Sequence, residues 1–165
     1  MKYYMLSLLI IFNTFISFSQ NITIGDLEKI VKLNLYETDL SLSSIGFSYE
    51  SSDSNELCKF HIFGKEKDKI KNIKEYSIVL KFFCKEINKI SYGVFDKSIY
   101  NSLRDEALKS NYKLIKTTTD ESGLKSTFMN IKSNFLIDFT QGKLKTESET
   151  STQYLIELYC RNSDL

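Results

Sequence analysis

The chain has 165 residues, of which 42% are hydrophobic and 26% are charged, with 22 Lys and Arg against 21 Asp and Glu. This composition is typical of one globular domain with a substantial core, and it excludes a disordered chain, a collagen-like repeat and a strongly basic nucleic-acid-binding protein. Three cysteines are too few for a disulfide-dense miniprotein of this length. Because the charges balance, the net charge of the protein does not identify a class of partner.

The first 19 residues have the pattern of a cleavable export signal. Lys2 supplies a short positive region, residues 5–18 form an apolar stretch, and Ser17 and Ser19 are small residues suited to a cut after Ser19. A membrane-spanning helix needs about 20 apolar residues, and this stretch is shorter. We therefore expect a signal peptide over 1–19, a periplasmic or secreted protein and no membrane span after cleavage. An uncleaved anchor is the alternative.

Helical patterns precede strand patterns in the first half of the remaining chain. Residues 22–33 predict a helix, because Thr23 can cap its start and Asp26 completes the capping pair. A second short helix is expected from Thr38 towards Ile45, ended by Gly46. Alternation of apolar and polar residues then predicts strands, which are expected near 47–50, 57–63, 76–84 and 90–95. The lysine-rich run over 65–75 is expected to be a solvated loop.

The same order of patterns recurs in the second half. Asp96 can cap a helix from Lys97 to about Ser110, and Asn111 tolerates the left-handed conformation that ends a helix. A strand pattern begins at Tyr112. Further strand patterns lie over 129–139, either as one long strand or as a hairpin broken near 132–134, and over 154–160.

A shared motif indicates an internal repeat. The segments YSIVLKF at 76–82 and YLIELYC at 154–160 both contain Tyr-x-Ile-x-Leu and lie 78 residues apart. That spacing is close to half of the 146 residues that follow a cut after residue 19. We expect Tyr76, Ile78 and Leu80 to be buried equivalents of Tyr154, Ile156 and Leu158, although two similar strands could also arise by chance.

The predicted fold class is therefore α+β, with two tandem helix-plus-antiparallel-strand units forming a sheet that has helices on one face. The single domain would span residues 20–165, with halves of about 20–89 and 90–165.

Two resemblances add to this expectation. The segment DKSIYNSLRDEALKSNYKLIKTT, followed by GLKSTFMN, resembles a loose group of small exported proteins from Bacteroidetes-type bacteria. The order of elements is similar to that of the beta-lactamase inhibitor protein family, which implies an inhibitor or binding module that uses a sheet face. No functional residue matches that family, so the resemblance transfers no site, and similarity of fold does not establish function.

No catalytic constellation is present in the sequence. His61 is the only histidine, which excludes zinc sites built on several histidines, and it is expected to be a solvent-facing strand residue. The sequence has no GxSxG elbow, P-loop or GxGxxG motif. Nothing selects a pair of carboxylates for glycoside hydrolysis. We therefore expect no catalytic residues, no cofactor and no bound metal.

The three cysteines all fall on apolar faces of predicted strands, where three buried thiols are the simplest interpretation. An exported chain can meet an oxidising compartment, however. If strands 57–63 and 76–84 form a hairpin, Cys58 and Cys84 can lie opposite each other, with Gly64 opposite Ile78. A disulfide between Cys58 and Cys84 is the open alternative, and it would leave Cys160 unpaired.

The sequence favours a non-catalytic binding module whose partner is another envelope or secreted protein. The candidate site is the sheet face opposite the helices, where aromatic and charged side chains mix. Alternation assigns nine residues to this face: Lys59, His61, Phe63, Lys81, Phe83, Lys113, Ile115, Glu157 and Tyr159. An ordinary solvated or packed face is an equal alternative. Two other classes remain open, a small hydrolase of cell-envelope polymers and a structural envelope protein.

Overall fold

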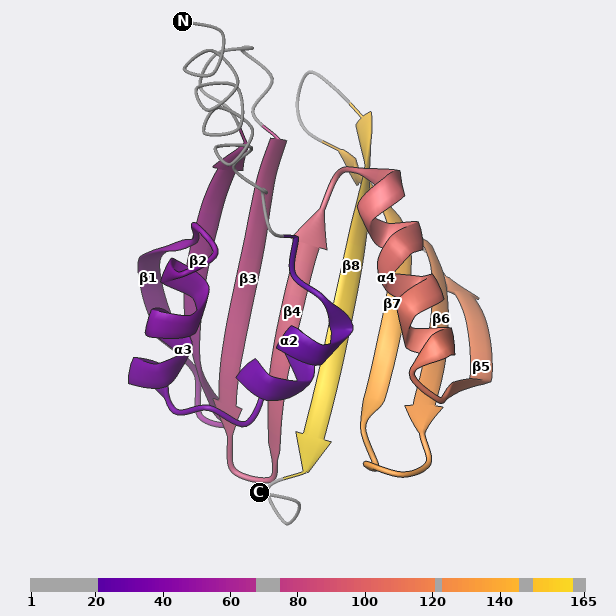
Figure 1. Ribbon diagram of the computed structural model, residues 1–165. Coiled ribbons are helices and arrows are strands. Elements are labelled where there is room, and N and C mark those ends of the chain that lie inside the picture. The colour runs from indigo at the N-terminus through magenta and orange to yellow at the C-terminus, as the bar shows by residue number, and fades with distance from the viewer. Residues whose placement is uncertain (1–20, 68–74, 121–122, 146–149, 162–165) are drawn as a thin grey trace, which may run out of the picture.

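The computed structural model describes residues 21–67, 75–120, 123–145 and 150–161 (Figure 1). The expected signal peptide and most of the lysine-rich run lie outside the described residues. Residues 65–67 and 75 are the exceptions, because they belong to strands, and the ammonium group of Lys65 donates to the carbonyl of Ile45. The loop expected over 65–75 was therefore wrong for residues 65–67 and 75.

The described chain forms one antiparallel sheet of eight strands with three helices, so the expected α+β class is confirmed, although strands dominate. The strands β1 to β4 form one sequential meander, and β5 to β8 form another. The sheet order is β1-β2-β3-β4-β8-β7-β6-β5, so the two meanders meet where β4 pairs with β8. The strands are β1 (Ser48–Ser54), β2 (Cys58–Lys67), β3 (Glu75–Cys84), β4 (Ile87–Val94), β5 (Tyr112–Asp120), β6 (Gly123–Asn130), β7 (Leu136–Lys145) and β8 (Thr150–Arg161).

Three helices with clear local start signals precede the two meanders, two of them before β1 and one between β4 and β5. The helix α2 (Ile24–Ile30) begins with the expected capping box of Thr23 and Asp26. The next helix, α3 (Leu35–Ser43), begins three residues before the predicted start, because Asn34 and Glu37 form a second capping box. Asp96 caps α4 (Lys97–Lys109) as predicted. Gly46 and Asn111 have the positive φ angles expected of residues that end helices.

Figure 1 shows the three helices in front of the sheet, and side-chain contacts agree with this view. Tyr112 of β5 donates to the carboxylate of Glu28 in α2. Tyr100 of α4 packs against the rings of Phe139 in β7 and Tyr154 in β8. The core lies between these helices and the sheet. We call this side of the sheet the helix face and the other side the open face.

The expected equivalence of the two Tyr-x-Ile-x-Leu strands was wrong. The first motif lies in β3, the third strand of its meander, whereas the second lies in β8, the fourth strand of its own. Ile78 and Leu80 are only partly buried and lie on the open face, while Ile156 and Leu158 are fully buried on the helix face. The side chain of Tyr76 is outside the described residues. The first meander also extends to Val94, beyond the expected division at residue 89.

Candidate functional site

The nine residues expected on one uncovered face are divided between the two faces. Five of them lie on the helix face: Lys59, His61, Phe63, Lys81 and Phe83. Phe63 and Lys81 are each 0% exposed, and Lys81 donates to the carbonyl of Val31 at the end of α2. Glu157 and Tyr159 lie on the open face as expected, together with the exposed Lys113. The exposed Ile115 lies at a β-bulge in β5.

The alternation of residues between the two faces was predicted correctly, but the set that faces the helices was not. Placing Lys59, His61 and Lys81 on the uncovered face left their apolar neighbours Phe60, Ile62 and Leu80 for the core. Their neighbours Phe63 and Val79 are the fully buried ones. The face that the helices leave uncovered is therefore as apolar, on β2 and β3, as the face that they cover.

His61 was expected to face solvent, but it is partly buried between aromatic rings. Its ring centroid lies 5.8 Å from that of Phe83 and 6.1 Å from that of Tyr49. Burial, followed by the positive charge of Lys59, lowers the pKa of His61 below its usual value. Its Nδ1 atom has no hydrogen-bond partner among the described residues. These two ring contacts describe a histidine that packs between aromatic side chains, with Ser52 directly opposite it on β1.

Cys58 and Cys84 form a disulfide, in the register that the hairpin predicted. Gly64 lies opposite Ile78, as expected. Cys160 is outside this disulfide and is buried on the helix face. The disulfide joins β2 to β3 near one end of the open face. It therefore holds together the two strands that carry the aromatic side chains of that face.

The first part of the open face, which we call the apolar half, lies on β2 and β3. Its five members are all partly exposed: Phe60, Ile62, Ile78, Leu80 and Phe82. The ring centroids of Phe60 and Phe82 are 5.5 Å apart. The ammonium group of Lys89, on the neighbouring strand β4, lies 4.1 Å from the centroid of the Phe82 ring. No described helix packs on this surface (Figure 1).

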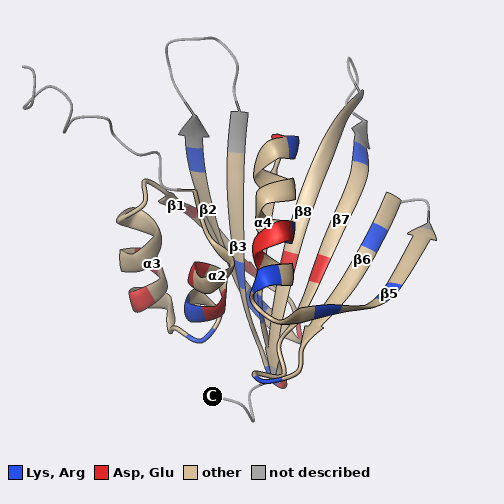
Figure 2. Cartoon of the chain, turned by 45° about the vertical axis from the view of Figure 1, so that its right-hand side comes forward, with Lys and Arg blue, Asp and Glu red and all other residues tan. Residues whose placement is uncertain are grey.

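The second part of the open face carries a line of polar side chains across five strands. We call it the polar row; it consists of cross-strand neighbours on β4, β8, β7, β6 and β5, namely Ser91, Glu157, Asp138, Thr127 and Lys116. At its centre two carboxylates, those of Glu157 and Asp138, lie directly opposite each other. Figure 2 shows these acidic positions side by side in β8 and β7, with basic positions beyond them in β6 and β5.

Lysines from adjacent positions neutralise both carboxylates. Lys89 lies 3.0 Å from Glu157, and Lys125 lies 2.6 Å from Asp138. Without these partners, two like charges directly opposite on adjacent strands would destabilise the sheet. The hydroxyl of Tyr159 also donates to Glu157 over 3.1 Å. Burial, followed by the charges of Glu157 and Asp138, raises the pKa of Tyr159, so its hydroxyl keeps its proton at neutral pH.

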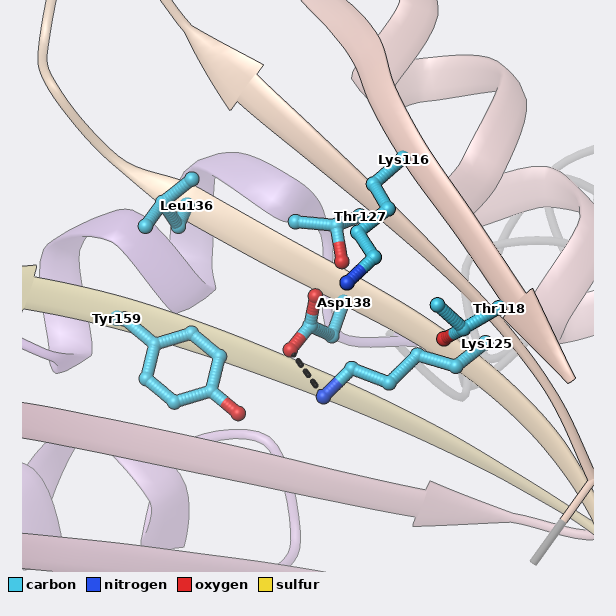
Figure 3. A pocket seen from close by; sticks show the side chains of 7 residues that line it. All are labelled: Lys116, Thr118, Lys125, Thr127, Leu136, Asp138 and Tyr159. Carbon is cyan, nitrogen blue, oxygen red and sulfur yellow. Dashed lines mark ion pairs between the residues drawn. The ribbon is translucent and has the colours of Figure 1, made fainter. Parts of the chain in front are cut away.

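A hollow of about 360 Å³ opens beside Asp138 on this half of the face (Figure 3). Its seven lining residues come from β5, β6, β7 and β8: Lys116, Thr118, Lys125, Thr127, Leu136, Asp138 and Tyr159. Asp138 is only 5% exposed, and its second carboxylate oxygen, Oδ1, has no hydrogen-bond partner among the described residues. The hollow therefore combines a buried acceptor with lysine and hydroxyl donors and one aromatic wall.

The sequence pattern contained part of this site. Asp138 lies between the buried Ile137 and Phe139, so alternation alone places it on the other face. Its position beside Glu157 depends on the pairing of β7 with β8, which no local signal indicates. A strand over 123–130 was not expected, so Lys125 and Thr127 could not be assigned to the site.

No protein-family model, curated protein or solved structure matches this chain. Among the described residues, no group of three or more His, Cys, Asp or Glu side chains could hold a metal ion. None of the described helices is long and apolar enough to cross a membrane.

Proposed function

We propose that this chain is an exported, non-catalytic binding module that recognises a protein partner through the open face of its sheet. The observation that carries the proposal is the apolar half, where aromatic and aliphatic side chains remain partly exposed on two strands joined by a disulfide. Rigid aromatic side chains lose little entropy on binding and are common anchors of protein interfaces. Export, to the periplasm or the medium, rests on the sequence pattern of residues 1–19.

We further propose that the fold consists of two tandem helix-plus-strand units with helices on one face. The support is the element order, in which helices precede an antiparallel four-strand meander twice. In this arrangement β4 would correspond to β8. The similarity to the beta-lactamase inhibitor protein family concerns the same order of elements and agrees with a binding role, but it identifies no partner.

A site-specific photo-crosslinking experiment tests the binding role. A benzophenone amino acid is placed at Phe82 in the apolar half, and at Tyr36, which is 73% exposed on α3, as the matched aromatic control. Crosslinking in intact cells of the native host should give an adduct with one protein from position 82 and not from position 36. Adducts of equal yield from both positions, or none from position 82, would reject the proposal and leave a structural envelope protein as the better interpretation.

The alternative function is a small hydrolase of cell-envelope polymers. The specific observation in its favour is the pair Asp138 and Glu157, because paired carboxylates perform glycoside hydrolysis. Both carboxylates are engaged by lysines, however, and the hollow is part of a broad sheet face. Release of soluble sugars or peptides from purified envelope material, abolished by Glu157→Gln, would establish the hydrolase and displace the binding module.

A further inference from the structure

We propose that the hollow receives the side-chain carboxamide of an Asn or Gln residue of the protein partner, which donates to Asp138 and accepts from Lys116. This inference rests on the proposed function, because it assigns the chemistry of one part of the same open face. It concerns the hollow beside the polar row, whereas the binding role was argued from the apolar half.

The first step is the unmet acceptor at Asp138. Lys125 satisfies Oδ2 at 2.6 Å, whereas Oδ1 is buried without a donor among the described residues. A buried charged oxygen without a hydrogen-bond donor carries a desolvation penalty that a bound donor removes. Figure 3 shows this oxygen directed away from Lys125, towards the space bordered by Leu136, Thr127 and Lys116. This oxygen is therefore an acceptor beside the hollow for which the described residues supply no donor.

The second step is the charge of the surroundings. The side chain of the exposed Lys116 also lines the hollow and extends towards Asp138, and its ammonium group offers only donors (Figure 3). A carboxylate ligand would satisfy Lys116 but would bring a second negative charge to Asp138. A cationic ligand would satisfy Asp138 but would meet two lysines. A carboxamide has an N–H donor and a C=O acceptor without net charge, so it satisfies both groups.

The third step favours a protein ligand over an N-acetylated sugar, which also carries an amide. The hollow adjoins the apolar half, because the ammonium group of Lys89 lies over an aromatic ring of each. Lys89 lies 5.9 Å from the ring centroid of Tyr159, which lines the hollow, and 4.1 Å from that of Phe82. A folded partner can cover both parts of this surface at once, with apolar side chains on one part and a carboxamide in the other.

The test uses nuclear magnetic resonance titration of the isotopically labelled mature chain with single capped amino acids. The probe is N-acetyl-glutamine methylamide, and the matched control is N-acetyl-methionine methylamide, which has the same main-chain amides and a similar side-chain length. Further arms use capped glutamate, capped arginine and N,N′-diacetylchitobiose. A ligand of this size binds with millimolar affinity at best, so titration continues to about 100 mM.

We expect capped glutamine to shift amide signals of β5 to β8 around the hollow, with at least about tenfold higher affinity than capped methionine. Lys116→Met and Asp138→Asn should each weaken this binding about tenfold. Lys113→Met, which removes an exposed lysine of the same strand outside the hollow, should change it less than about twofold. Because Lys116 is exposed, its substitution tests the proposal even if the Asp138 variant does not fold.

Other outcomes overturn the inference. Tighter binding of capped glutamate or capped arginine would identify an anion or cation pocket, and tighter binding of the chitobiose would assign the hollow to a glycan. Equal binding of capped glutamine and methionine, or no shift around the hollow, would make it an ordinary solvated depression. A crosslinked partner at Phe82 combined with any of these results would retain the proposed function and reject only the carboxamide site.

Discussion

The ammonium group of Lys81 donates to the main-chain carbonyl of Val31, at the point where α2 ends against the sheet. Lys81 is 0% exposed and lies on the helix face, within 4.9 Å of the centroid of the Phe83 ring. The contact satisfies one helix-end carbonyl and the buried cation together. It also explains how a lysine can occupy a core position, since its stem packs among apolar side chains while its head bonds to the backbone.

This burial predicts a pH-dependent stability. Burial lowers the pKa of Lys81 from 10.5 to about 8, with the nearby Cys160 acting in the opposite direction. Between these values the unfolded chain binds more protons than the folded chain, so the free energy of unfolding rises as pH increases. Over this window the wild type should gain about 3 kcal/mol relative to Lys81→Met, in which no charge is buried.

Urea denaturation of both proteins at about pH 7 and about pH 10 measures this difference. Lys65→Met is the control, because Lys65 also donates to a helix-end carbonyl but is only partly buried. The stability difference between wild type and Lys65→Met should depend much less on pH. If the difference between wild type and Lys81→Met is independent of pH, Lys81 has an ordinary pKa in the folded protein.

Local signals in the sequence predicted local structure well. The capping residues Thr23 and Asp96 and the helix ends at Gly46 and Asn111 were correct because each depends on nearby backbone atoms. The register of the β2–β3 hairpin was also predictable, from the positions of Cys58 and Cys84.

The choice of the covered face was not predictable. On β3 the helix face includes the buried Lys81, while the open face includes Ile78, Leu80 and Phe82. A ranking by hydrophobicity therefore selects the wrong side. Which side the helices cover depends on the three-dimensional path of α2 and α4, which no local pattern indicates. The pairing of Asp138 with Glu157 was unpredictable for the same reason, because it depends on which strands become neighbours.

The disulfide is expected to contribute strongly to stability. Cys58 and Cys84 are 26 residues apart. Closing a loop of this size lowers the conformational entropy of the unfolded chain, which stabilises the folded protein by about 3 kcal/mol. The double substitution Cys58→Ser and Cys84→Ser should lower the free energy of unfolding by about this amount in urea denaturation. A reducing agent should destabilise the wild type similarly and have no further effect on the variant. A wild type that is insensitive to reduction would contradict this expectation.

Gly123 is expected to tolerate no side chain. Its φ angle is +129°, and an added Cβ would overlap the carbonyl group of Gln141 on the neighbouring strand β7. Gly123→Ala should therefore destabilise the protein by more than about 1 kcal/mol and weaken the β5–β6 hairpin. Gly25→Ala in α2 is the control, because an added Cβ there has only an ordinary contact at 3.8 Å from Thr23. This control should be neutral or stabilising by up to about 1 kcal/mol. Thermal unfolding distinguishes the two variants, and equal effects would contradict the strained conformation at position 123.

The last prediction compares two leucines that the shared motif made equivalent. Leu158 is fully buried on the helix face, whereas Leu80 is partly exposed on the open face. Leu158→Ala should cost about 2–5 kcal/mol, because it removes buried contacts and leaves a cavity. Leu80→Ala should cost about 1 kcal/mol, because its side chain is already partly in water and solvent can fill the space. Chemical denaturation of the two variants gives the comparison directly. If Leu80→Ala cost as much as Leu158→Ala, a second layer would cover the open face in the free protein, and that face would not be available to a partner.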